Sequence, residues 1–426
     1  MKILLINKFY YLKRGAEKHF FDLKKLLESK GHQVVVFSMQ DERNEKTPYA
    51  KYFVSKIETE KPRFSLRGAG RVFYSFEAKK KLEKLILAEK PDIAHVHNIY
   101  HQISPSILTV LKKHKIPIAM TLHDFKILCP VYILYSKGEI CEKCKTYRYW
   151  HCVTKKCAKN SYLASKLNAL EMCWHKFLRI YENNVSTFIV PSEFLKNKIL
   201  EWGRLPEAKI NVLPHFVDCN NLTAVTPKSP VLSLQTPVGG DLPLGRDGNY
   251  ILYFGSLSKE KGVRVLLEAA KILNENNNLK HEIHLAGTGP EEKALRDFVA
   301  KNYLSEKVKF CGYLTREALQ EKIKNSLFVV VPSITYETFG LSALEANALG
   351  KPVVASNLGA LPEIVIDKET GILFKAGDSR DLAEKISVML VSGDSKKGER
   401  AKEIAETKYN KENYWRELEK IYENIK

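Results

Sequence analysis

The sequence predicts an α/β protein of two domains, each a doubly wound parallel sheet, facing each other across a cleft. Three observations lead to this class. Short apolar runs alternate with stretches of helical periodicity up to residue 212, as in βαβ units. Residues 223–248 interrupt the alternation, and it restarts at residue 250. A length of 426 residues also suggests two domains rather than one.

The first half contains six apolar runs that fit buried strands. They lie at 3–6, 34–37, 93–96, 118–122, 188–190 and 210–212, with helical patterns at 16–30, 76–89 and 104–113. The stretch 223–248 is rich in Pro and Gly and has no helical period, which is typical of a linker. We therefore expect a first domain over 1–222 and a linker over 223–248.

The second half repeats the alternation. Strands are predicted at 250–254, 282–286, 307–310, 327–331 and 352–356, and helices at 262–275, 290–302, 315–324 and 340–349. Residues 380–426 are helical throughout in their pattern. We expect a second domain over 249–400 and a helical segment over 401–426, for which a return to the first domain is an open alternative.

The positive charge is concentrated in the first half. Residues 1–222 hold 39 Lys and Arg against 21 Asp and Glu, a net of +18, and the remainder holds 29 against 28, a net of +1. Such asymmetry favours an anionic partner, either a membrane surface or a phosphorylated acceptor. No nucleic-acid-binding signature accompanies it, so nucleic acid is not expected. A solvated basic surface without a partner is the alternative.

No apolar run approaches the roughly 18 residues that a membrane span needs. Residues 1–7 are too short for the apolar region of a signal peptide and fit a first strand instead. We therefore expect a cytoplasmic protein, with peripheral attachment to the inner face of the membrane as an option.

Two glutamates, Glu337 and Glu345, lie eight positions apart around a Thr-Phe-Gly turn. The turn connects the run 327–331 to the pattern 340–349, so a buried strand leads into a helix. Such a junction leaves backbone N–H groups at the carboxyl edge of the sheet, where an anion binds. Two carboxylates beside an anion indicate separate tasks, such as holding the hydroxyls of a nucleotide sugar. The alternative is a helix with ordinary acidic residues.

Glycine-containing turns follow four strands of the second half, at Gly255, Gly287, Gly312 and 337–340. Glycine lets the backbone approach a ligand closely, and Lys261 adds a positive charge for phosphate. Ligands of doubly wound sheets bind beyond the carboxyl ends of the strands. One such turn is a weak signal, but four at one edge predict a ligand site.

Seven motifs occur in order along the chain. They are G-A-E at 15–17, G-H at 31–32, T-L-H-D at 121–124, G-x-L-x-x-E-K-G at 255–262, A-G-x-G-P at 286–290, F-x-G at 310–312 and the two glutamates. Together they resemble the retaining glycosyltransferases of family four, which have the GT-B fold of two facing Rossmann-like domains. The resemblance covers almost the whole chain. It implies a nucleoside-diphosphate sugar as donor and no metal or other cofactor for catalysis.

The resemblance also implies roles for the glutamate segment. Glu345 would hold the ribose hydroxyls, and Glu337 would lie beside the transferred sugar. The backbone N–H groups of Phe339, Gly340 and Leu341 would meet the diphosphate or the sugar, as expected of a helix start.

The resemblance implies roles for residues outside the glutamate segment as well. Lys261 would neutralise the leaving diphosphate, which is the main electrostatic demand of an oxocarbenium-like transition state. Gly287 would belong to the donor site, Gly312 and its neighbours would flank the base, and Gly15 would let a loop of the first domain close on the phosphates. His123 would sit over the donor sugar from the other side of the cleft.

For His123 the alternative is a histidine that caps a helix or is satisfied in the core. His95, His97 and His101 cluster near another strand end and are candidates to line the acceptor side.

One position departs from the family. Ser256 stands where an arginine is common, so one of two cations expected on the diphosphate is missing. Ser256 can still donate a hydrogen bond, and Lys259 or Arg14 are candidates to compensate.

Five of the eight cysteines fall within 129–160, a basic and aromatic stretch that we interpret as an insertion near the acceptor face. A C-x2-C pair and a C-x4-C pair have spacings found in zinc sites, with ligands Cys141, Cys144, Cys152 and Cys157. A structural zinc, reduced thiols and disulfides are all open alternatives. The remaining cysteines are expected to be small buried hydrophobes: Cys173, Cys219 and Cys311.

The sequence therefore predicts a retaining, metal-independent hexosyltransferase that uses a UDP- or GDP-sugar. Its acceptor would be a glycan or a lipid-linked sugar, in cell-surface polysaccharide or glycolipid synthesis. The alternatives are another GT-B enzyme, such as a nucleotide-sugar epimerase or a phosphorylase, and a non-catalytic nucleotide-sugar-binding module.

Overall fold

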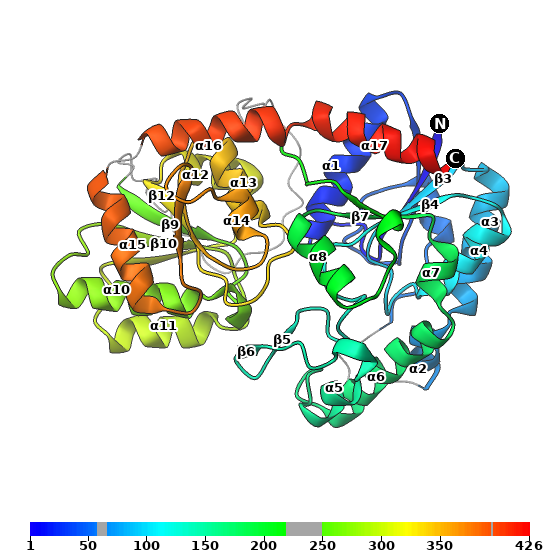
Figure 1. The fold of residues 1–426 in the computed structure, drawn as a ribbon, viewed down its shortest axis with the longest axis horizontal. Helices are drawn as coiled ribbons and strands as arrows, with labels where there is room; N and C mark the ends of the chain where they lie inside the picture. Colours follow the sequence, from blue (N-terminus) through cyan, green and yellow to red (C-terminus); the bar gives the residue numbers. More distant parts are fainter. Residues whose placement is uncertain (58–65, 219–248, 393–394) are drawn as a thin grey trace. The chain divides into compact units, whose positions relative to one another are not determined.

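The computed structural model describes residues 1–57, 66–218, 249–392 and 395–426. The chain forms two compact units, one of Met1–Phe216 with Lys411–Lys426 and one of Val217–Asn410. Each unit contains one six-stranded parallel sheet (Figure 1). This architecture confirms the predicted α/β class. The predicted linker, 223–248, lies outside the described residues.

The sheet of the first unit has the strand order β2-β1-β3-β4-β7-β8. Its strands are β1 Lys2–Ile6, β2 Gln33–Phe37, β3 Ile93–Val96, β4 Ile118–Thr121, β7 Thr187–Val190 and β8 Ile210–Val212. Its helices are α1 Gly15–Ser29, α2 Leu66–Phe73, α3 Phe76–Glu89, α4 Leu108–Lys113, α5 Trp150–Thr154, α6 Tyr162–Phe177, α7 Ile180–Asn184, α8 Glu193–Glu201 and α17 Lys411–Ile425.

An apolar core covers one face of this sheet. Ile3 and Leu5 are both fully buried in it, as expected of alternate residues on a strand. The helix α1 contributes Phe20, and the terminal helix α17 contributes Leu418 and Tyr422 to the same cluster. The last helix of the chain is therefore part of the first unit.

The second sheet has the order β11-β10-β9-β12-β13-β14. Its strands are β9 Tyr250–Phe254, β10 Glu282–Ala286, β11 Val308–Gly312, β12 Phe328–Val331, β13 Val353–Ser356 and β14 Gly371–Phe374. Its helices are α10 Val263–Glu275, α11 Glu292–Lys301, α12 Arg316–Lys324, α13 Leu341–Ala348, α14 Leu361–Ile364, α15 Ser379–Ser392 and α16 Ser395–Lys408.

Both faces of the second sheet are apolar. Ile251 and Tyr253 of β9 join a core with α10, α11 and α15, and their neighbours Leu252 and Phe254 join another with α13 and α14. Burial on both faces explains why the strands are continuous apolar runs in the sequence. In doubly wound sheets of this kind, ligands bind at the carboxyl ends of the strands and the loops after them.

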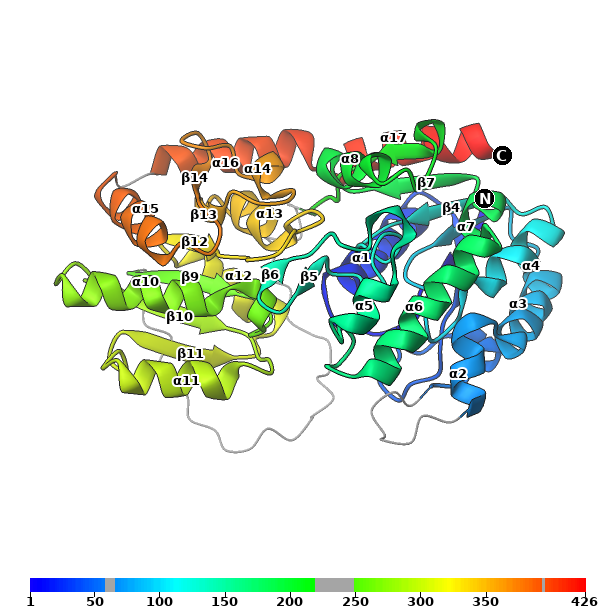
Figure 2. The ribbon, with the colours of Figure 1, turned by 60° about the horizontal axis from the view of Figure 1, so that its bottom comes forward.

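Two parts of the chain differ from the simple alternation. The stretch 380–426 is not one helical element but three helices, and α17 lies in the other unit from α15 and α16. The connection from β4 to β7 holds a short hairpin, β5 Tyr135–Ser136 with β6 Glu139–Ile140, and the contacting helices α5 and α6 (Figure 2). None of the described helices is long and apolar enough to cross a membrane.

Candidate active site

Three glycine-containing loops form one surface at the carboxyl edge of the second sheet. The backbone N–H of Gly287 donates to the Gly312 carbonyl at 2.7 Å, and the N–H of Leu257 donates to the Thr288 carbonyl at 3.0 Å. Gly287 has φ +141°, and a Cβ added there would lie 1.8 Å from the Gly255 carbonyl oxygen. Only glycine fits this close approach of two backbones.

Ser256 lies in the first of these loops and is half-buried. Its carbonyl accepts a hydrogen bond of 2.7 Å from the Tyr253 hydroxyl, so a side chain of β9 fixes the backbone of the loop. Lys259, a candidate to compensate for the missing arginine, is exposed in the next turn.

Lys261 ends the turn Lys259–Lys261 and is followed by Gly262, which has φ +69°. A Cβ at Gly262 would lie 1.8 Å from the Pro332 carbonyl oxygen. The N–H of Ile334 also donates to the Glu260 carbonyl at 3.0 Å. The loop that carries Lys261 is therefore packed directly on the loop that follows β12.

This packing brings Lys261 and Glu337 together. Lys261 Nζ lies 2.6 Å from Glu337 Oε1, and the Ser333 hydroxyl donates to the same oxygen at 2.6 Å. Burial raises the pKa of Glu337, but the Lys261 ammonium and the Ser333 hydroxyl outweigh it and hold the pKa below its ordinary value. Glu337 is therefore an ionised carboxylate at neutral pH. From the sequence the two residues were expected on different parts of the ligand, and their contact was not predicted.

The rest of the glutamate segment begins the helix α13. Phe339 is buried, Gly340 precedes the helix with φ +102°, and Leu341 is its first residue. Glu345 lies on α13 and is half-buried, whereas Glu337 lies in the loop before it. The two carboxylates thus come from different elements.

The carboxyl edge of the first sheet gathers residues that follow β1, β3 and β4. The N–H of Lys8 donates to the Asn98 carbonyl at 2.8 Å, and the N–H of Asn98 donates to the side-chain oxygen of Asn7 at 3.2 Å. His123 and Asp124 follow β4 at the same edge, and both are half-buried. Gly15 is exposed at the start of α1.

His123 is hydrogen-bonded to another histidine. Its Nε2 lies 2.8 Å from Nδ1 of His97, and the two rings stack with centroids 5.1 Å apart. Burial lowers the pKa of His123 to about 3 and also lowers that of His97. Both rings are therefore neutral at pH 7 and share a single hydrogen. If that hydrogen is on His97, the remaining N–H of His123 is at Nδ1.

Two further histidines extend this stack and were not singled out from the sequence. The ring of His19 lies 3.9 Å from that of His215 and 5.4 Å from that of His123. Burial lowers the pKa of both His19 and His215. The sequence pattern gave little indication that these histidines meet. His19 lies within the helix α1, and His215 follows β8, the last strand of the sheet.

His95 and His101 do not line this edge together. His95 is fully buried between the Tyr422 hydroxyl, at 2.6 Å, and the Thr121 hydroxyl, at 2.7 Å. His101 instead contacts the buried Glu171 at 3.2 Å. His95 also stacks on His97, with ring centroids 4.7 Å apart, so the structure brings these two predicted residues together and places His101 elsewhere.

Lys8, Glu17 and Asp124 form a charged group that was not predicted from the sequence. Lys8 Nζ lies over the Tyr100 ring at 4.0 Å. Burial lowers the pKa of Lys8 to about 8, against the attraction of Asp124. Burial likewise raises the pKa of Asp124 to about 6 and that of Glu17 above its ordinary value. Lys8 follows its strand as closely as His123 does, so the same positional rule finds it.

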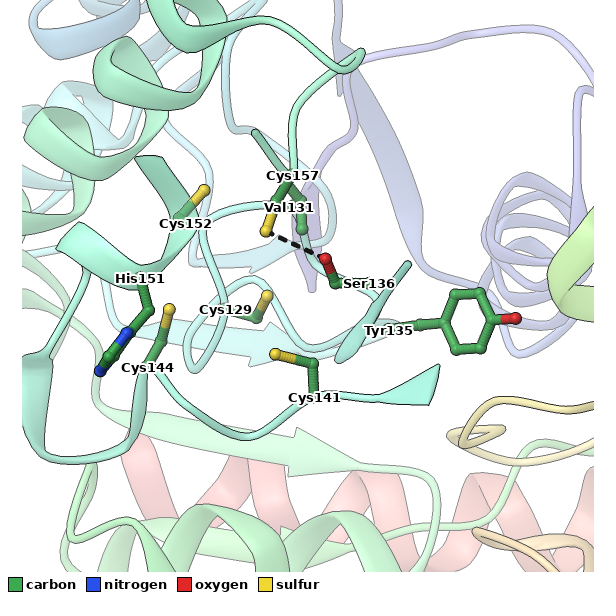
Figure 3. Close-up of a pocket in the computed structure, with 9 residues that line it drawn as sticks. All are labelled: Cys129, Val131, Tyr135, Ser136, Cys141, Cys144, His151, Cys152 and Cys157. Carbon is green, nitrogen blue, oxygen red and sulfur yellow. Dashed lines mark hydrogen bonds between the residues drawn. The ribbon is translucent and has the colours of Figure 1, made fainter. Parts of the chain in front are cut away.

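Five cysteine thiols line one small cavity in the β4–β7 connection, here named the thiol pocket (Figure 3). They are Cys129, Cys141, Cys144, Cys152 and Cys157. Within the described ranges, no group of three or more His, Cys, Asp or Glu side chains is arranged to hold a metal ion. The structure thus does not support a zinc ion held by Cys141, Cys144, Cys152 and Cys157.

The other cysteines differ from their expected burial. Cys173 is exposed on α6 because it lies on the outer side of that helix, so the expectation that it is buried is wrong. Cys311 is half-buried, and Cys219 lies outside the described residues.

Comparison with known proteins adds the family. The profile of "Glycosyl transferases group 1" matches residues 241–410, and that of "Glycosyltransferase Family 4" matches residues 13–221. An uncharacterised glycosyltransferase of Methanocaldococcus jannaschii is 34% identical over 181 residues, which are 42% of this chain and 49% of that protein. The alignment thus spans about half of that relative.

A second relative is the lipopolysaccharide 1,2-N-acetylglucosaminetransferase of Salmonella typhimurium. It is 30% identical over 253 residues, which are 57% of this chain and 63% of that protein.

Two solved structures share the fold. Sucrose-phosphate synthase of Thermosynechococcus elongatus has a TM-score of 0.69 at 19% identity, covering 100% of this chain and 98% of that one. Anabaena HepE, in complex with UDP and glucose, has a TM-score of 0.68 at 17% identity, covering 100% of both chains. The fold is that of the GT-B glycosyltransferases. Together with the two profiles, it assigns the chain to the group 1 glycosyltransferases of family 4.

Proposed function

We propose that this protein is a retaining glycosyltransferase that moves a sugar from a nucleoside-diphosphate sugar to a glycan or lipid-linked acceptor. The observation that carries the proposal is the Lys261–Glu337 pair, set in glycine-containing loops at the carboxyl edge of the second sheet. Close-packed backbone at a strand edge suits a diphosphate. The names of relatives agree: one transfers N-acetylglucosamine to lipopolysaccharide, and HepE was solved with UDP and glucose.

The second unit would bind the donor. Lys261 would stabilise the charge that develops on the leaving diphosphate, and the N–H groups of Phe339, Gly340 and Leu341 would bind its oxygens. Glu345, on the helix, would hold the ribose hydroxyls. The loops of Ser256, Gly287 and Gly312 would flank the diphosphate and the base.

Glu337 would have two roles in the reaction. Its carboxylate holds the Lys261 ammonium in place before the donor arrives, so the cation needs little reorganisation. The same carboxylate carries a negative charge that would favour an oxocarbenium-like sugar in the transition state. The leaving diphosphate would act as the base that takes the acceptor proton, since retention places both on one face of the sugar. No metal is required in this scheme.

The first unit would bind the acceptor and complete the donor site. His123, neutral and held by His97, would donate a hydrogen bond to a sugar hydroxyl. Gly15, at the start of α1, would approach the phosphates. Lys8 and the positive charge of residues 1–222 suit an acceptor that carries a phosphate, or an anionic membrane surface at the cytoplasmic face.

Release of nucleoside diphosphate, measured with and without acceptor, tests the proposal. A preceding thermal-shift screen of UDP- and GDP-sugars selects the donor, because a ligand at 100 times its Kd adds about 2.7 kcal/mol to the free energy of unfolding. Acceptor-dependent release with retained anomeric configuration is expected. Conversion of the nucleotide sugar without acceptor would indicate an epimerase instead, and binding without turnover would indicate a non-catalytic module.

A further inference from the structure

The exposed apolar side chains of the first unit are concentrated on and around the helix α6. Sixteen large apolar side chains are exposed in the described residues, and seven of them lie within 150–178. They are Trp150, Tyr162, Leu163, Leu170, Trp174, Phe177 and Leu178. Apolar residues scattered singly over a surface need no explanation, but a group of this kind marks a binding surface.

Four of these side chains form one side of the helix, here named the α6 face: Leu163, Leu170, Trp174 and Phe177. Their spacing along α6 places them on the same side of the helix. Leu163 is 76% exposed and Phe177 is 79% exposed. The rings of Trp174 and Phe177 stack with their centroids 6.1 Å apart. The α6 face is therefore a continuous apolar stripe in contact with solvent.

The other side of α6 already packs within the first unit. Ala169, Met172 and His175 are buried there, and α6 contacts α5 (Figure 2). The helix therefore does not use the α6 face to hold its place in the fold. A helix that is apolar on both sides is stable only where its outer side also finds apolar surroundings.

The chain around the α6 face is basic. Residues 143–170 hold seven Lys and Arg and no Asp or Glu. Lys159 and Lys166 are exposed, and Lys156 Nζ lies over the Tyr162 ring at 4.3 Å. The acidic residue of α6, Glu171, is buried and pairs with Lys126 at 2.7 Å. Exposed Trp, Tyr and Leu bordered by lysines are typical of helices that lie in a membrane interface.

We propose that the α6 face docks on an anionic lipid bilayer. Leu163, Trp174 and Phe177 enter the boundary between headgroups and acyl chains, and the lysines around them bind lipid phosphates. A second copy of the chain would meet repulsion at this face, because a symmetric dimer brings its two basic segments 143–170 together. The purpose of docking rests on the proposed function, since it brings the enzyme to a surface that holds a lipid-linked acceptor.

Co-sedimentation of the full chain with vesicles tests the proposal. The chain should bind vesicles of phosphatidylglycerol and phosphatidylcholine, and should not bind vesicles of phosphatidylcholine alone. Raising the salt from about 0.1 M to about 1 M NaCl should weaken the binding, because the screening length falls from about 10 Å to about 3 Å. Equal binding to both kinds of vesicle, or none to either, would overturn the proposal.

Substitutions on the α6 face separate it from the rest of the surface. Leu163→Ser with Phe177→Ser should weaken binding at least about tenfold, because two large side chains are no longer transferred out of water. The matched control is Tyr303→Ser with Val391→Ser, which removes two apolar side chains of the second unit that are 90% and 89% exposed. The control should bind as the wild type does, and an equal loss in both variants would refute the assignment.

A second pair of variants tests the charge. Lys166→Gln should weaken binding about fivefold, which corresponds to about 1 kcal/mol for one cation near an anionic surface. Lys375→Gln removes the same charge from an exposed position in the second unit and should have no effect. Equal effects would show that net charge, rather than the α6 face, directs the binding.

Tryptophan fluorescence reports whether the α6 face enters the lipid. Of the four tryptophans, Trp202 and Trp415 are buried, so Trp174 is the remaining exposed one in Trp150→Phe. Phosphatidylglycerol with brominated acyl chains should quench the fluorescence of this variant, and the quenching should be lost in Trp150→Phe with Trp174→Phe. Binding without quenching would contradict insertion.

Sedimentation velocity without lipid checks the competing occupant. A dimer that Leu163→Ser with Phe177→Ser dissociates would assign the α6 face to a second copy and overturn the proposal. Vesicle binding without acceptor-dependent transfer would count against the proposed function alone. Transfer to a soluble acceptor without vesicle binding would count against the docking surface alone.

Discussion

Lys261 and Glu337 form an ion pair whose two ends differ in exposure. The Lys261 side chain is 36% exposed, and that of Glu337 is 17% exposed. Because solvent reaches the lysine end, we expect the pair to add only about 1 kcal/mol to stability. The position of the pair at the strand edge fits the proposed donor site.

Replacing Glu337 by Gln tests this assignment. The amide is the same size and can accept from Ser333, but it has no charge to hold Lys261. We expect kcat for nucleotide-sugar turnover to fall roughly 10²- to 10³-fold, in the range seen when one transition-state contact is lost. Steady-state release of nucleoside diphosphate measures it.

The control is Glu369→Gln, which breaks the exposed Glu369–Arg400 pair of 2.7 Å in the same unit. It should leave kcat unchanged, and both variants should keep the wild-type Tm within a few degrees. A Glu337→Gln enzyme with full activity would exclude Glu337 from the site.

Single residues were predictable where position along the chain decides their place. Glu337 follows a buried run and Glu345 lies within a helical pattern, so the sequence alone separates the loop residue from the helix residue. His19, His97 and His215 come from a helix and two strand ends, and their stacking around His123 depends on how these elements pack. Sequence spacing does not contain that information.

The turn between β9 and α10 is the element that brings Lys261 to Glu337. Gly262→Ala should destabilise the protein by at least about 2 kcal/mol, because a Cβ at φ +69° is strained and also collides with the Pro332 carbonyl. Urea unfolding measures the loss, and donor affinity should fall with it because the two loops separate.

Gly377→Ala is the matched control for this substitution. Gly377 has φ +80°, but nothing lies within 4 Å of an added Cβ, so only the backbone strain of about 1 kcal/mol applies. An equal loss in the two variants would show that the contact with the β12 loop is unimportant.

The helix α17 stabilises the first unit through two tyrosines. Tyr422 is fully buried and its hydroxyl lies 2.6 Å from Nδ1 of His95. Tyr422→Phe leaves that ring nitrogen buried without a partner, which should cost about 1–3 kcal/mol in urea unfolding. Tyr414→Phe removes the longer contact of 3.2 Å to His19 and should cost less. The opposite order would contradict the hydrogen-bond geometry.

Elements with a strong period were predictable. The pattern 340–349 corresponds to α13, which spans Leu341–Ala348, and all five strands predicted for the second half are present. The short hairpin β5–β6 and the strand β14 were missed, since two to four residues carry too little periodicity. The helical pattern over 380–426 left open whether its last helix returns to the first domain, and the structure places that helix in the first unit.

The whole molecule should lose stability in mild acid. Burial lowers the pKa of His95 and of His123 to about 3, compared with about 6.5 in an unfolded chain. Below pH 6.5 the unfolded chain therefore binds protons that the folded chain does not, and the free energy of unfolding falls as pH drops towards 3. For His95 alone the loss is about 2 kcal/mol between neutral pH and pH 5.

Asp124 works in the opposite direction, because its pKa is raised to about 6 and its carboxyl is protonated more readily in the folded state. It offsets part of the loss caused by the histidines. Urea unfolding at pH 7, 6 and 5 measures the balance. Unchanged stability across this range would mean that the buried histidines take up protons in the folded state.

The sequence determined the two parallel sheets, the family and the strand edges at which the candidate site lies, because these depend on local periodicity and on residues within one loop. It also located the positive charge in residues 1–222. Only the tertiary structure decided that Lys261 pairs with Glu337, that five histidines stack beside one sheet edge and that five cysteines line one cavity. Such contacts join segments whose meeting depends on packing, and side-chain chemistry alone does not specify them.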